Sequence, residues 1–474
     1  MSAIKFGTDG WRAIIARDFT FANCRIVAQA IASYINGQNL GKKGLVIGYD
    51  NRFLSEEFAA DCARVIAGNG IKVHLFKKAS PTPQTAFAIR ARDTAGAIMI
   101  TASHNPPEYQ GIKFIPWYAG PALPEVTDVI EEALERVTAT GKVYELDLAE
   151  ASRLHLYEEI DLEKEYSAAL LTLINPDYIR KNPPKVVIDP MFGAGIGFLE
   201  RILGELGCEI RSINSYRDPL FGGSLPEPTE SVLQDLKRTV LTYNADIGLA
   251  MDGDADRFGV IDRDGSFVSA NRFMSLLLHH LLTVHKFRGP VCRSLATTHM
   301  LDRIARKNGI ETIETPVGFK YIGAALRDNS CIMGGEESGG VSIIGHVPEK
   351  DGILACLLAV EMIAYSGKTL AGLEEDLAAK YGPVISQRLD IRVKAEDWPD
   401  INDRMREYSP IQLGGIRVEA LDRREGLKIL LEDESWALIR VSGTEPLFRV
   451  YVEACSEKQM AGIQKEVIEA LGLG

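Results

Sequence analysis

Three aspartates follow an apolar segment in the middle of the chain and could hold a metal ion. The segment DIGLAM runs directly into DGDADR, which places Asp252, Asp254 and Asp256 at alternate positions. Three carboxylates this close repel one another unless a hard cation lies between them, and oxygen ligands suit Mg²⁺. A calcium EF-hand is excluded, because the positions that require Gly and Glu in that loop are both arginine here. Arg257, next to the aspartates, could hold an anion that also touches the metal. The other interpretation is a solvated acidic turn.

One serine lies on a loop that two prolines stiffen. Ser103 belongs to TASHNPP, which follows the apolar segment GAIMI. Proline fixes the backbone and prevents regular structure, so the hydroxyl would be held on a rigid loop. A serine accepts phosphate when a metal neutralises the charge and a base removes the proton. The alternative is a strand-ending turn in which serine and asparagine cap main-chain groups. His104 is expected to orient this loop.

A third polar loop, GGEESGG, carries Glu336, Glu337 and Ser338 between glycines. Carboxylates accept hydrogen bonds from hydroxyl groups in pairs, so this loop suits the neighbouring hydroxyls of a sugar. A polar surface turn is the alternative.

A fourth loop, RVSGTEPLFR, gathers cations, hydroxyls and main-chain N–H groups within ten residues. Such a set suits a phosphate dianion, and the alternative is an exposed turn with incidental arginines. The candidate phosphate ligands are Arg440, Ser442, Gly443, Thr444 and Arg449.

The elements that must position these loops follow a repeated plan. Each of three stretches has the pattern of a strand, a helix, a second strand and a later strand that ends in a polar loop. Strands alternating with helices form mainly parallel sheets, and ligands bind beyond the carboxyl ends of such strands. Three loops in matching places therefore predict one site assembled from three domains. The predicted strands are 45–50, 72–76, 96–100, 185–189, 208–213, 246–251, 290–296, 311–316 and 330–333, and the predicted helices include 55–68, 198–206 and 300–308.

The C-terminal part of the chain has a different pattern. From residue 385 alternating strands follow one another closely, and a helix over 457–471 closes the chain, which predicts an antiparallel sheet with covering helices. The predicted fold class is therefore α/β, with three similar α/β domains of mostly parallel mixed sheets and a C-terminal α+β domain with an antiparallel sheet. We expect the domains to span 1–150, 151–262, 263–378 and 379–474. The predicted C-terminal strands are 388–393, 415–421, 427–433, 436–441 and 447–454.

Composition narrows the class of protein. A chain of 474 residues has room for three or four domains, and 53 basic against 65 acidic side chains give a net charge of −12. That charge argues against general binding of nucleic acid. Seven scattered cysteines without a C-x-x-C pair indicate reduced core thiols. The N-terminal residues lack an apolar signal core, and the apolar stretch 352–365 is too short to span a bilayer, so we expect a cytoplasmic protein without a membrane partner.

In this order, the four loops resemble those of the α-D-phosphohexomutase superfamily, which includes phosphoglucomutases and phosphomannomutases. TASHNP is similar to its phosphoserine loop, DGDADR to its metal loop, GEES to its sugar-binding loop and SGTEP to its phosphate-binding loop. FGTDGWR (6–12) resembles the N-terminal signature of the family, so the likeness covers essentially the whole chain.

The resemblance implies a role for each candidate residue. Ser103 would carry the phosphoryl group, and Mg²⁺ would be held by that phosphate and the three aspartates. Cationic side chains would lie near the moving phosphoryl group, and Lys113 would also donate or accept a proton. Glu336 and Ser338 would hold sugar hydroxyls, and Lys320, in TPVGFKYIG, would help to bind the ligand. The cationic set implied by the resemblance is Arg12, Lys113 and Arg257.

Two departures from the family pattern stand out. Many bacterial relatives end the sugar loop in a histidine that is a candidate general base, and this chain has Gly340 there, which leaves the base unassigned. Val441 replaces a proline that is common before SGTEP, which should matter little because the hydroxyls and arginines remain. GEES and HVPEKDG (346–352) look more like glucose-type phosphoglucomutases.

The resemblance implies an isomerase that interconverts glucose 1-phosphate and glucose 6-phosphate through a hexose 1,6-bisphosphate. The alternatives are a phosphomannomutase or dual-specificity enzyme, a phosphoglucosamine mutase, a metal-dependent phosphatase and a non-catalytic sugar-phosphate-binding protein. Small phosphosugars are the expected partners, and the chain is expected to be a monomer or a homodimer.

Overall fold

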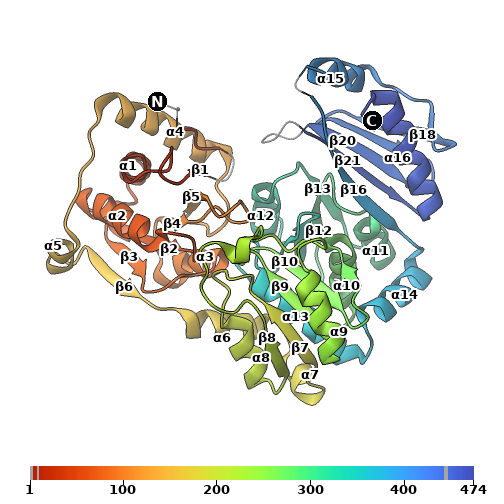
Figure 1. Cartoon of the computed structure of the whole chain (residues 1–474), viewed down its shortest axis with the longest axis horizontal. Coiled ribbons are helices and arrows are strands. Elements are labelled where there is room, and N and C mark those ends of the chain that lie inside the picture. The colour runs from red at the N-terminus through yellow and green to blue at the C-terminus, as the bar shows by residue number, and fades with distance from the viewer. Residues whose placement is uncertain (1–3, 8–9, 395, 442–446, 474) are drawn as a thin grey trace.

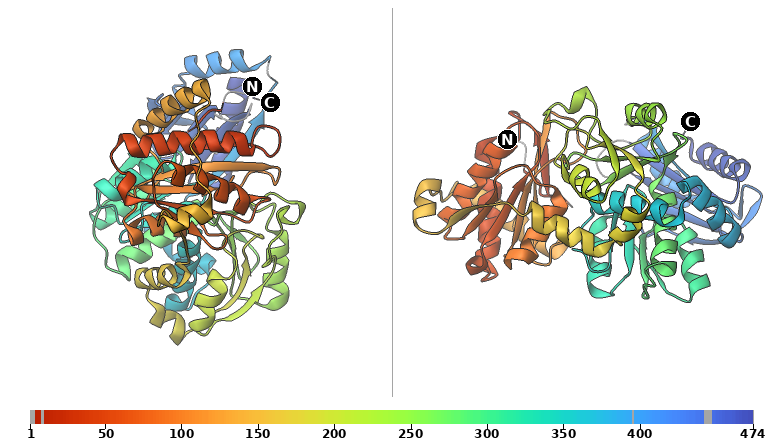
Figure 2. Two further views of the ribbon diagram at one scale, coloured as in Figure 1. Left: turned by 90° about the vertical axis from the view of Figure 1, so that its left-hand side faces the viewer. Right: turned by 90° about the horizontal axis from the view of Figure 1, so that it is seen from below.

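Four sheets with covering helices make up the molecule. The structure is a computed structural model that describes residues 4–7, 10–394, 396–441 and 447–473. The chain runs from the first sheet at one end of the molecule to the fourth at the other, with the second and third between them (Figures 1 and 2). We call these four parts units 1 to 4. The predicted fold class is confirmed: three mixed, mainly parallel sheets precede an antiparallel one.

Unit 1 has a six-stranded sheet in the order β1-β5-β4-β2-β3-β6. Its central strands β2 and β4 are parallel and fully buried, as expected for apolar runs covered on both faces. The elements of unit 1 are β1 (Trp11–Ile14), α1 (Phe21–Gly37), β2 (Leu45–Tyr49), α2 (Ser55–Gly68), β3 (Val73–Phe76), α3 (Thr82–Arg92), β4 (Gly96–Ile100), β5 (Tyr109–Pro116), α4 (Pro124–Thr140), α5 (Leu148–Arg153) and β6 (Tyr157–Ile160).

Unit 2 has a five-stranded sheet in the order β11-β10-β9-β7-β8. Its elements are α6 (Glu163–Leu173), α7 (Pro176–Lys181), β7 (Lys185–Asp189), α8 (Phe198–Glu205), β8 (Glu209–Ser212), α9 (Gln234–Tyr243), β9 (Ile247–Met251), β10 (Phe258–Asp262) and β11 (Phe267–Val268).

Unit 3 has a four-stranded sheet in the order β13-β12-β14-β15. Its elements are α10 (Ala270–Thr283), β12 (Val291–Ser294), α11 (Met300–Asn308), β13 (Thr312–Thr315), α12 (Phe319–Asp328), β14 (Met333–Glu336), β15 (Gly340–Ile343), α13 (Gly352–Ser366) and α14 (Leu370–Tyr381).

The first three sheets share one core topology. In each, a first strand lies between two parallel partners, and the third strand pairs antiparallel with the strand that follows it. The turn between those last two strands is the serine loop in unit 1, the aspartate loop in unit 2 and the glutamate loop in unit 3. The three loops therefore occupy equivalent places, as the repeated sequence plan predicts.

The third strand of unit 3 is shifted from its predicted position. The sequence predicts a strand over 330–333, whereas β14 begins at Met333 and includes both glycines and Glu336. These two strand positions hold glycine because a Cβ at Gly334 would collide with Cys292 Sγ, and one at Gly335 with Met274 Sδ. Glu336 is thus held at the rigid end of a strand.

Unit 4 has an antiparallel sheet in the order β16-β21-β20-β19-β18-β17, as predicted for the C-terminal part. Its elements are β16 (Ile385–Arg392), α15 (Trp398–Glu407), β17 (Gln412–Leu413), β18 (Ile416–Asp422), β19 (Leu427–Leu431), β20 (Trp436–Val441), β21 (Leu447–Ala454) and α16 (Glu457–Leu471).

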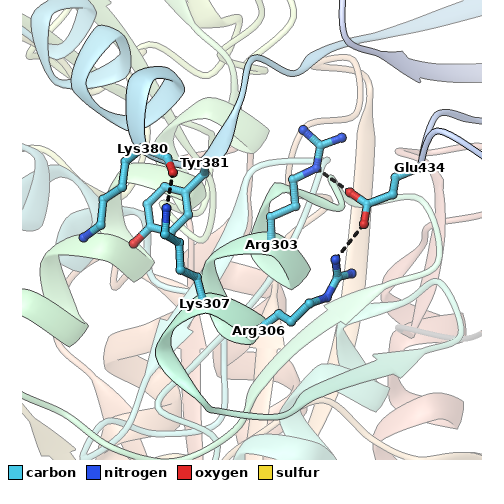
Figure 3. Close-up of a pocket in the computed structure, with 6 residues that line it drawn as sticks. All are labelled: Arg303, Arg306, Lys307, Lys380, Tyr381 and Glu434. Carbon is cyan, nitrogen blue, oxygen red and sulfur yellow. Dashed lines mark hydrogen bonds and ion pairs between the residues drawn. The ribbon is translucent and has the colours of Figure 1, made fainter.

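Ion pairs tie unit 4 to unit 3. Glu434, in the turn between β19 and β20, accepts hydrogen bonds from Arg303 and Arg306 on α11 at 2.8 and 2.6 Å. Figure 3 shows this contact at the edge of a pocket of about 340 Å³ that Lys307 and Tyr381 also line. The pocket belongs to the joint between the two units and includes none of the predicted site residues.

Helix α13 forms a core shared by units 2 and 3. Every residue from Gly352 to Ala364 is buried, and the helix packs against β9, β10 and α10. Within the described residues no single helix is long and apolar enough to cross a membrane; α13 and α14 pass that test only together, and the chain bends by 77° between them.

The cysteines are free thiols. Six are buried, as predicted for core thiols. Cys455 differs because it lies in the turn between β21 and α16, where it is exposed.

Two short strands lie on the other side of an expected domain limit from the sheet that they join. β6 pairs with β3 in unit 1, although it lies beyond residue 150, and β11 pairs with β10 in unit 2, although it lies beyond residue 262.

Candidate active site

The carboxylates of Asp252, Asp254 and Asp256 lie together just beyond the end of β9. All three side chains are buried, and one oxygen of each lies within 4.8 Å of the other two. Asp254 Oδ1 and Asp256 Oδ1 have no hydrogen-bond partner among the described residues. Buried carboxylate oxygens without a partner are costly, and an all-oxygen set suits a hard divalent cation. The residues present therefore fit Mg²⁺.

Two lysines balance part of this negative charge. Lys113 Nζ lies 2.9 Å from Asp254 Oδ2 and 3.3 Å from Asp256 Oδ2, and Lys350 Nζ lies 3.2 Å from the same oxygen of Asp256. Burial raises the pKa of both carboxyls, but the lysines outweigh it and hold each pKa below its usual value. No lysine of the described residues pairs with Asp252, so burial and its two neighbouring aspartates raise its pKa well above the usual range.

Ser103 reaches the aspartates across the boundary between units 1 and 2. Its Oγ donates a hydrogen bond of 2.9 Å to Asp252 Oδ2, and its side chain is buried. The same boundary is closed by Thr82 at the start of α3, whose Oγ1 donates to Asp254 Oδ2 at 2.6 Å. The backbone of Ser103 is left-handed, with φ of 51°. The structure thus brings together the serine and the aspartates that the sequence singled out.

Arg52 fixes the serine loop, and sequence reasoning did not single it out. Its guanidinium is fully buried, lies 3.3 Å from Asp50 and stacks on Phe221 of unit 2 at 4.9 Å. It donates four hydrogen bonds of 2.6 to 3.0 Å to main-chain carbonyls, those of Ser103, Asn105, Pro106 and Tyr109. Its only signal in the sequence is its position, because Arg52 lies just beyond the end of β2.

Arg12 and His104 flank the serine. Arg12, on β1, donates a hydrogen bond of 2.7 Å to Asn105 Oδ1 on the serine loop. His104 Nδ1 lies 3.4 Å from Ser103 Oγ. The positive charge of Arg257, together with burial and Arg12, lowers the pKa of His104 far below its usual value. The imidazole is therefore neutral, and it can accept or orient a proton but adds no charge.

Arg257 links the aspartate loop to its surroundings. Its main-chain N–H donates to Asp252 Oδ1 at 3.0 Å, and its guanidinium donates to Glu227 Oε1 at 3.1 Å. A Cβ built at Gly339 in the glutamate loop would lie in van der Waals contact with Arg257, so the loops of units 2 and 3 also meet.

Lys350 occupies the space in front of Gly340. A Cβ at position 340 would collide with Cδ and Cγ of Lys350, and the ammonium group lies 5.3 Å from the centre of the Phe319 ring. A side chain at position 340 and Lys350 in this conformation exclude each other. Lys350 is a second residue that sequence reasoning missed, although HVPEKDG was noted for its resemblance.

The glutamate loop contributes one buried carboxyl. Glu336 Oε1 accepts a hydrogen bond of 2.7 Å from the main-chain N–H of Gly318. Burial and the nearby Glu337 raise the pKa of Glu336 to about 7. Glu337 accepts a hydrogen bond of 3.2 Å from Ser294, on β12.

Ser338 and Lys320 are half-buried. Lys320 Nζ lies 5.1 Å from the centre of its neighbour's ring, Tyr321. Ser338 lies two residues after Glu336 in the chain. Lys320 lies two residues after Gly318, whose main-chain N–H binds Glu336.

The two arginines of the predicted phosphate loop lie side by side in unit 4. Arg440 on β20 is paired with Arg449 on β21, and Arg440 also lies 3.5 Å from Glu425. Arg440 lines a pocket of about 480 Å³ together with Arg406 and Arg423. The loop between the strands, with Ser442, Gly443 and Thr444, lies outside the described residues. Figure 1 shows unit 4 on the opposite side of the molecule from unit 1.

Four family models match the chain in order. They are those of phosphoglucomutase/phosphomannomutase alpha/beta/alpha domain I at residues 3–140, domain II at 164–265, domain III at 269–381 and the C-terminal domain at 391–470. The chain belongs to the phosphoglucomutase/phosphomannomutase family. It is therefore a phosphohexomutase, an isomerase of the α-D-phosphohexomutase superfamily.

Relatives within the family carry several names. A Thermococcus kodakarensis protein named "Phosphoglucomutase/phosphomannomutase" is 31% identical over 96% of this chain and 95% of its own. A Pyrococcus abyssi protein named "Probable phosphoglucosamine mutase" is 32% identical over 97% and 96%. A crystal structure from Thermus thermophilus, titled a "putative phosphomannomutase", is 34% identical, covers 99% of both chains and has a TM-score of 0.85. Family membership therefore fixes the class of reaction and leaves the sugar open.

Proposed function

We propose that this phosphohexomutase interconverts glucose 1-phosphate and glucose 6-phosphate through a phosphorylated Ser103. The observation that carries this proposal is the hydrogen bond of 2.9 Å from Ser103 Oγ to Asp252 Oδ2, because it joins the serine of unit 1 to the buried aspartates of unit 2. GEES and HVPEKDG, which look more like glucose-type enzymes, support glucose as the sugar.

In the proposed reaction, phospho-Ser103 gives its phosphoryl group to the free hydroxyl of the sugar phosphate. The new bond forms to the sugar oxygen, the bond to Ser103 Oγ breaks, and the proton of the sugar hydroxyl is taken up within the site. The hexose 1,6-bisphosphate then turns end for end, and its other phosphate returns to Ser103. The same hexose 1,6-bisphosphate supplied from solution would phosphorylate an unphosphorylated serine.

Asp252, Asp254 and Asp256 would hold Mg²⁺ together with the phosphate on Ser103. When bound, this ion supplies Lewis-acid stabilisation of charge on the phosphoryl oxygens. Arg12, which binds the serine loop, and Arg257 would add positive charge on the other sides of the moving group.

Lys113 and Lys350 would transfer protons and stabilise negative charge beside the three aspartates. Both ammonium groups contact Asp256, so they are fixed where negative charge develops. We propose Lys113 as the proton donor or acceptor, with neutral His104 orienting the serine. Lys350 stands where a side chain at position 340 would otherwise reach the site.

The remaining parts of the substrate would be bound by units 3 and 4. Glu336 and Ser338 would hold sugar hydroxyls, with Lys320 beside them. The non-reacting phosphate would be bound by the loop of unit 4, through Arg440, Ser442, Gly443, Thr444 and Arg449. One such clamp can serve both orientations of the bisphosphate, because either phosphate can occupy it while the other reacts.

The proposed domains follow the expected limits of 1–150, 151–262, 263–378 and 379–474, with β6 added to the first domain and β11 to the second. This assignment rests on the sheets that these strands join.

A side-by-side assay of 1-phosphosugars tests the substrate. The purified protein with Mg²⁺ and a trace of glucose 1,6-bisphosphate should convert glucose 1-phosphate faster than mannose 1-phosphate or glucosamine 1-phosphate. Fast conversion of only mannose or glucosamine phosphates would contradict the choice of sugar and leave the mechanism standing. Release of free phosphate in place of an isomer would indicate a phosphatase and contradict both.

A further inference from the structure

Two histidines and a glutamate meet in the core of units 2 and 3, away from the aspartates. His280 lies in the last turn of α10, His285 follows that helix, and Glu361 lies on α13. The Nε2 atoms of His280 and His285 lie 2.9 and 2.6 Å from the same oxygen, Glu361 Oε1. Glu361 is fully buried, and the side chains of His280 and His285 are only 7% and 11% exposed.

The surroundings hold the three groups in this arrangement. The ring of His280 packs edge-on against His285 and against Tyr365, and His285 packs against Phe287. The second oxygen of Glu361 accepts the main-chain N–H of Asn175 at 3.0 Å.

The chemistry of these donors differs from that of the aspartate cluster. Two imidazole nitrogens and one carboxylate oxygen, all within 4.8 Å of one another, form a set that suits zinc and neighbouring transition metals rather than magnesium. Two histidines and one glutamate also leave a fourth coordination position, which water would fill.

The distances are compatible with a bound ion. Zinc lies about 2.0–2.1 Å from nitrogen and oxygen ligands, and tetrahedral geometry then separates neighbouring donors by roughly 3.3 Å. The observed separations of 2.6 and 2.9 Å would have to widen by less than about 1 Å, which a small rotation of the Glu361 side chain can provide.

We propose that His280, His285 and Glu361 form a second metal site that takes a divalent transition metal such as Zn²⁺. Its proposed role is to join elements of the core, with water as the fourth ligand. It fastens the end of α10 to α13 in unit 3 and, through Asn175, to the start of α7 in unit 2. It is separate from the aspartate cluster, because Glu361 lies nine residues, or roughly 14 Å, along α13 from the end of that helix that contacts Ala255.

Metal binding to the full-length protein tests this proposal. The protein is stripped with a chelator and dialysed against dilute Zn²⁺ in a large excess of Mg²⁺, which occupies the aspartate cluster, and the bound zinc is measured by elemental analysis. The test variant is His285→Gln, at the most exposed of the three ligands, and Glu361→Gln is a second one. His279→Gln is the matched control, because His279 is the neighbouring histidine on α10 and binds Tyr381 instead.

Wild type and the His279→Gln control should retain about one zinc ion per chain, and both ligand variants should lose it. Co²⁺ in place of zinc should give the visible absorption of a four-coordinate ion, which an all-oxygen six-coordinate site lacks. Zinc should also raise the thermal midpoint of wild type and of the control but not that of His285→Gln. Circular dichroism of the metal-free proteins identifies a variant that has failed to fold. If Glu361→Gln does not fold, the test rests on His285→Gln. The proposal is overturned if wild type retains no zinc in excess Mg²⁺, or if folded His285→Gln retains as much as wild type.

Discussion

The guanidinium of Arg52 donates a hydrogen bond of 2.7 Å to the main-chain carbonyl of Ser103. Three further carbonyls accept hydrogen bonds from this one side chain, two on the same loop and that of Tyr109 at the start of β5. The prolines stiffen the loop locally, but Arg52 fixes it to the sheet of unit 1. Arg52 therefore also fixes the position of the serine hydroxyl relative to the aspartates. Arg52 is a positioning residue, since it acts through the loop and does not touch the reacting atoms.

Replacing Arg52 should therefore reduce kcat more than it changes KM. In Arg52→Lys, one ammonium group cannot reach four carbonyls, and we expect kcat to fall about 10- to 100-fold at nearly constant KM. Arg52→Met also leaves Asp50 as an unpaired buried charge, and should lose roughly 3–5 kcal/mol of unfolding free energy. Steady-state kinetics and urea unfolding measure both effects. Arg17→Lys, at an exposed arginine, is the control, and an unchanged kcat in folded Arg52→Lys would contradict the positioning role.

Ser103→Ala should abolish the phosphoenzyme and lower mutase activity by at least about a thousandfold, because the phosphoryl group then has no carrier. Incubation with glucose 1,6-bisphosphate followed by intact-protein mass spectrometry should show one added phosphate on wild type and none on the variant. Ser152→Ala, at an exposed serine of α5, should behave like wild type. Full activity of Ser103→Ala would sink the phosphoserine mechanism.

Removing Mg²⁺ should affect both activity and stability. Without a cation the three buried carboxylates repel one another, so a chelator should abolish turnover, and added Mg²⁺ should restore it and raise the thermal midpoint. Asp254→Asn should lose most of this Mg²⁺-dependent rise. Differential scanning fluorimetry measures the thermal midpoint. An equal Mg²⁺-dependent rise in wild type and Asp254→Asn would show that the stabilising ion binds elsewhere.

The contact between Gly340 and Lys350 predicts non-additive substitutions. Gly340→Ala should push Lys350 away from Asp256 and lower kcat by about tenfold. In Lys350→Ala only Phe319 Cδ2, at 3.2 Å, stays close to the added methyl group, which should then cost little more. The double variant should thus be no slower than Lys350→Ala alone. Gly462→Ala on α16, where a Cβ meets open space, controls for the change of residue type. Simple multiplication of the two single effects on kcat would show that the residues act independently.

Glu336 should make the stability of the enzyme depend on pH. Its pKa is raised from the ordinary value of 4.5 to about 7, so between these pH values the folded state keeps a proton that the unfolded state has lost. The unfolding free energy should therefore fall as the pH rises through this window, by at most on the order of 3 kcal/mol. Glu336→Gln should remove this component, whereas Glu135→Gln, at an exposed glutamate, should not. Urea unfolding at pH 4.5, 6 and 8 measures it, and parallel pH profiles for wild type and Glu336→Gln would contradict the shift.

Much of the fold was predictable, because its strands are apolar runs with polar ends. The predicted strand 96–100 and the helices 55–68, 300–308 and 457–471 have the bounds of β4, α2, α11 and α16. The sequence did not predict β5, β10 and β15, the strands that follow the three polar loops, and it misplaced β14, where the two glycines look like a loop. These strand positions require glycine because Cys292 and Met274 approach from other elements and leave no space for a side chain, which the sequence alone does not show.

The site was predictable where its residues lie on the repeated loops, as Ser103 and the aspartates do. Arg52 and Lys350 were not found, because each matters through partners distant in the sequence. Arg52 binds carbonyls more than 50 residues away, and Lys350 reaches an aspartate in unit 2. Hydrogen bonds to main-chain carbonyls leave no signature in the residue types of the loop that receives them.

The left-handed backbone of Ser103 restricts which nucleophile this position can carry. Threonine has the same hydroxyl group, but its branched Cβ makes a φ of 51° a conformational outlier that costs roughly 1–3 kcal/mol. The added methyl group would also need space beside Asp252, where the side chain of Ser103 is already buried. A threonine at this position would thus keep the hydroxyl group but would not hold it in the same position relative to Asp252. We therefore expect threonine to be a poor replacement for Ser103, even though it keeps the hydroxyl group.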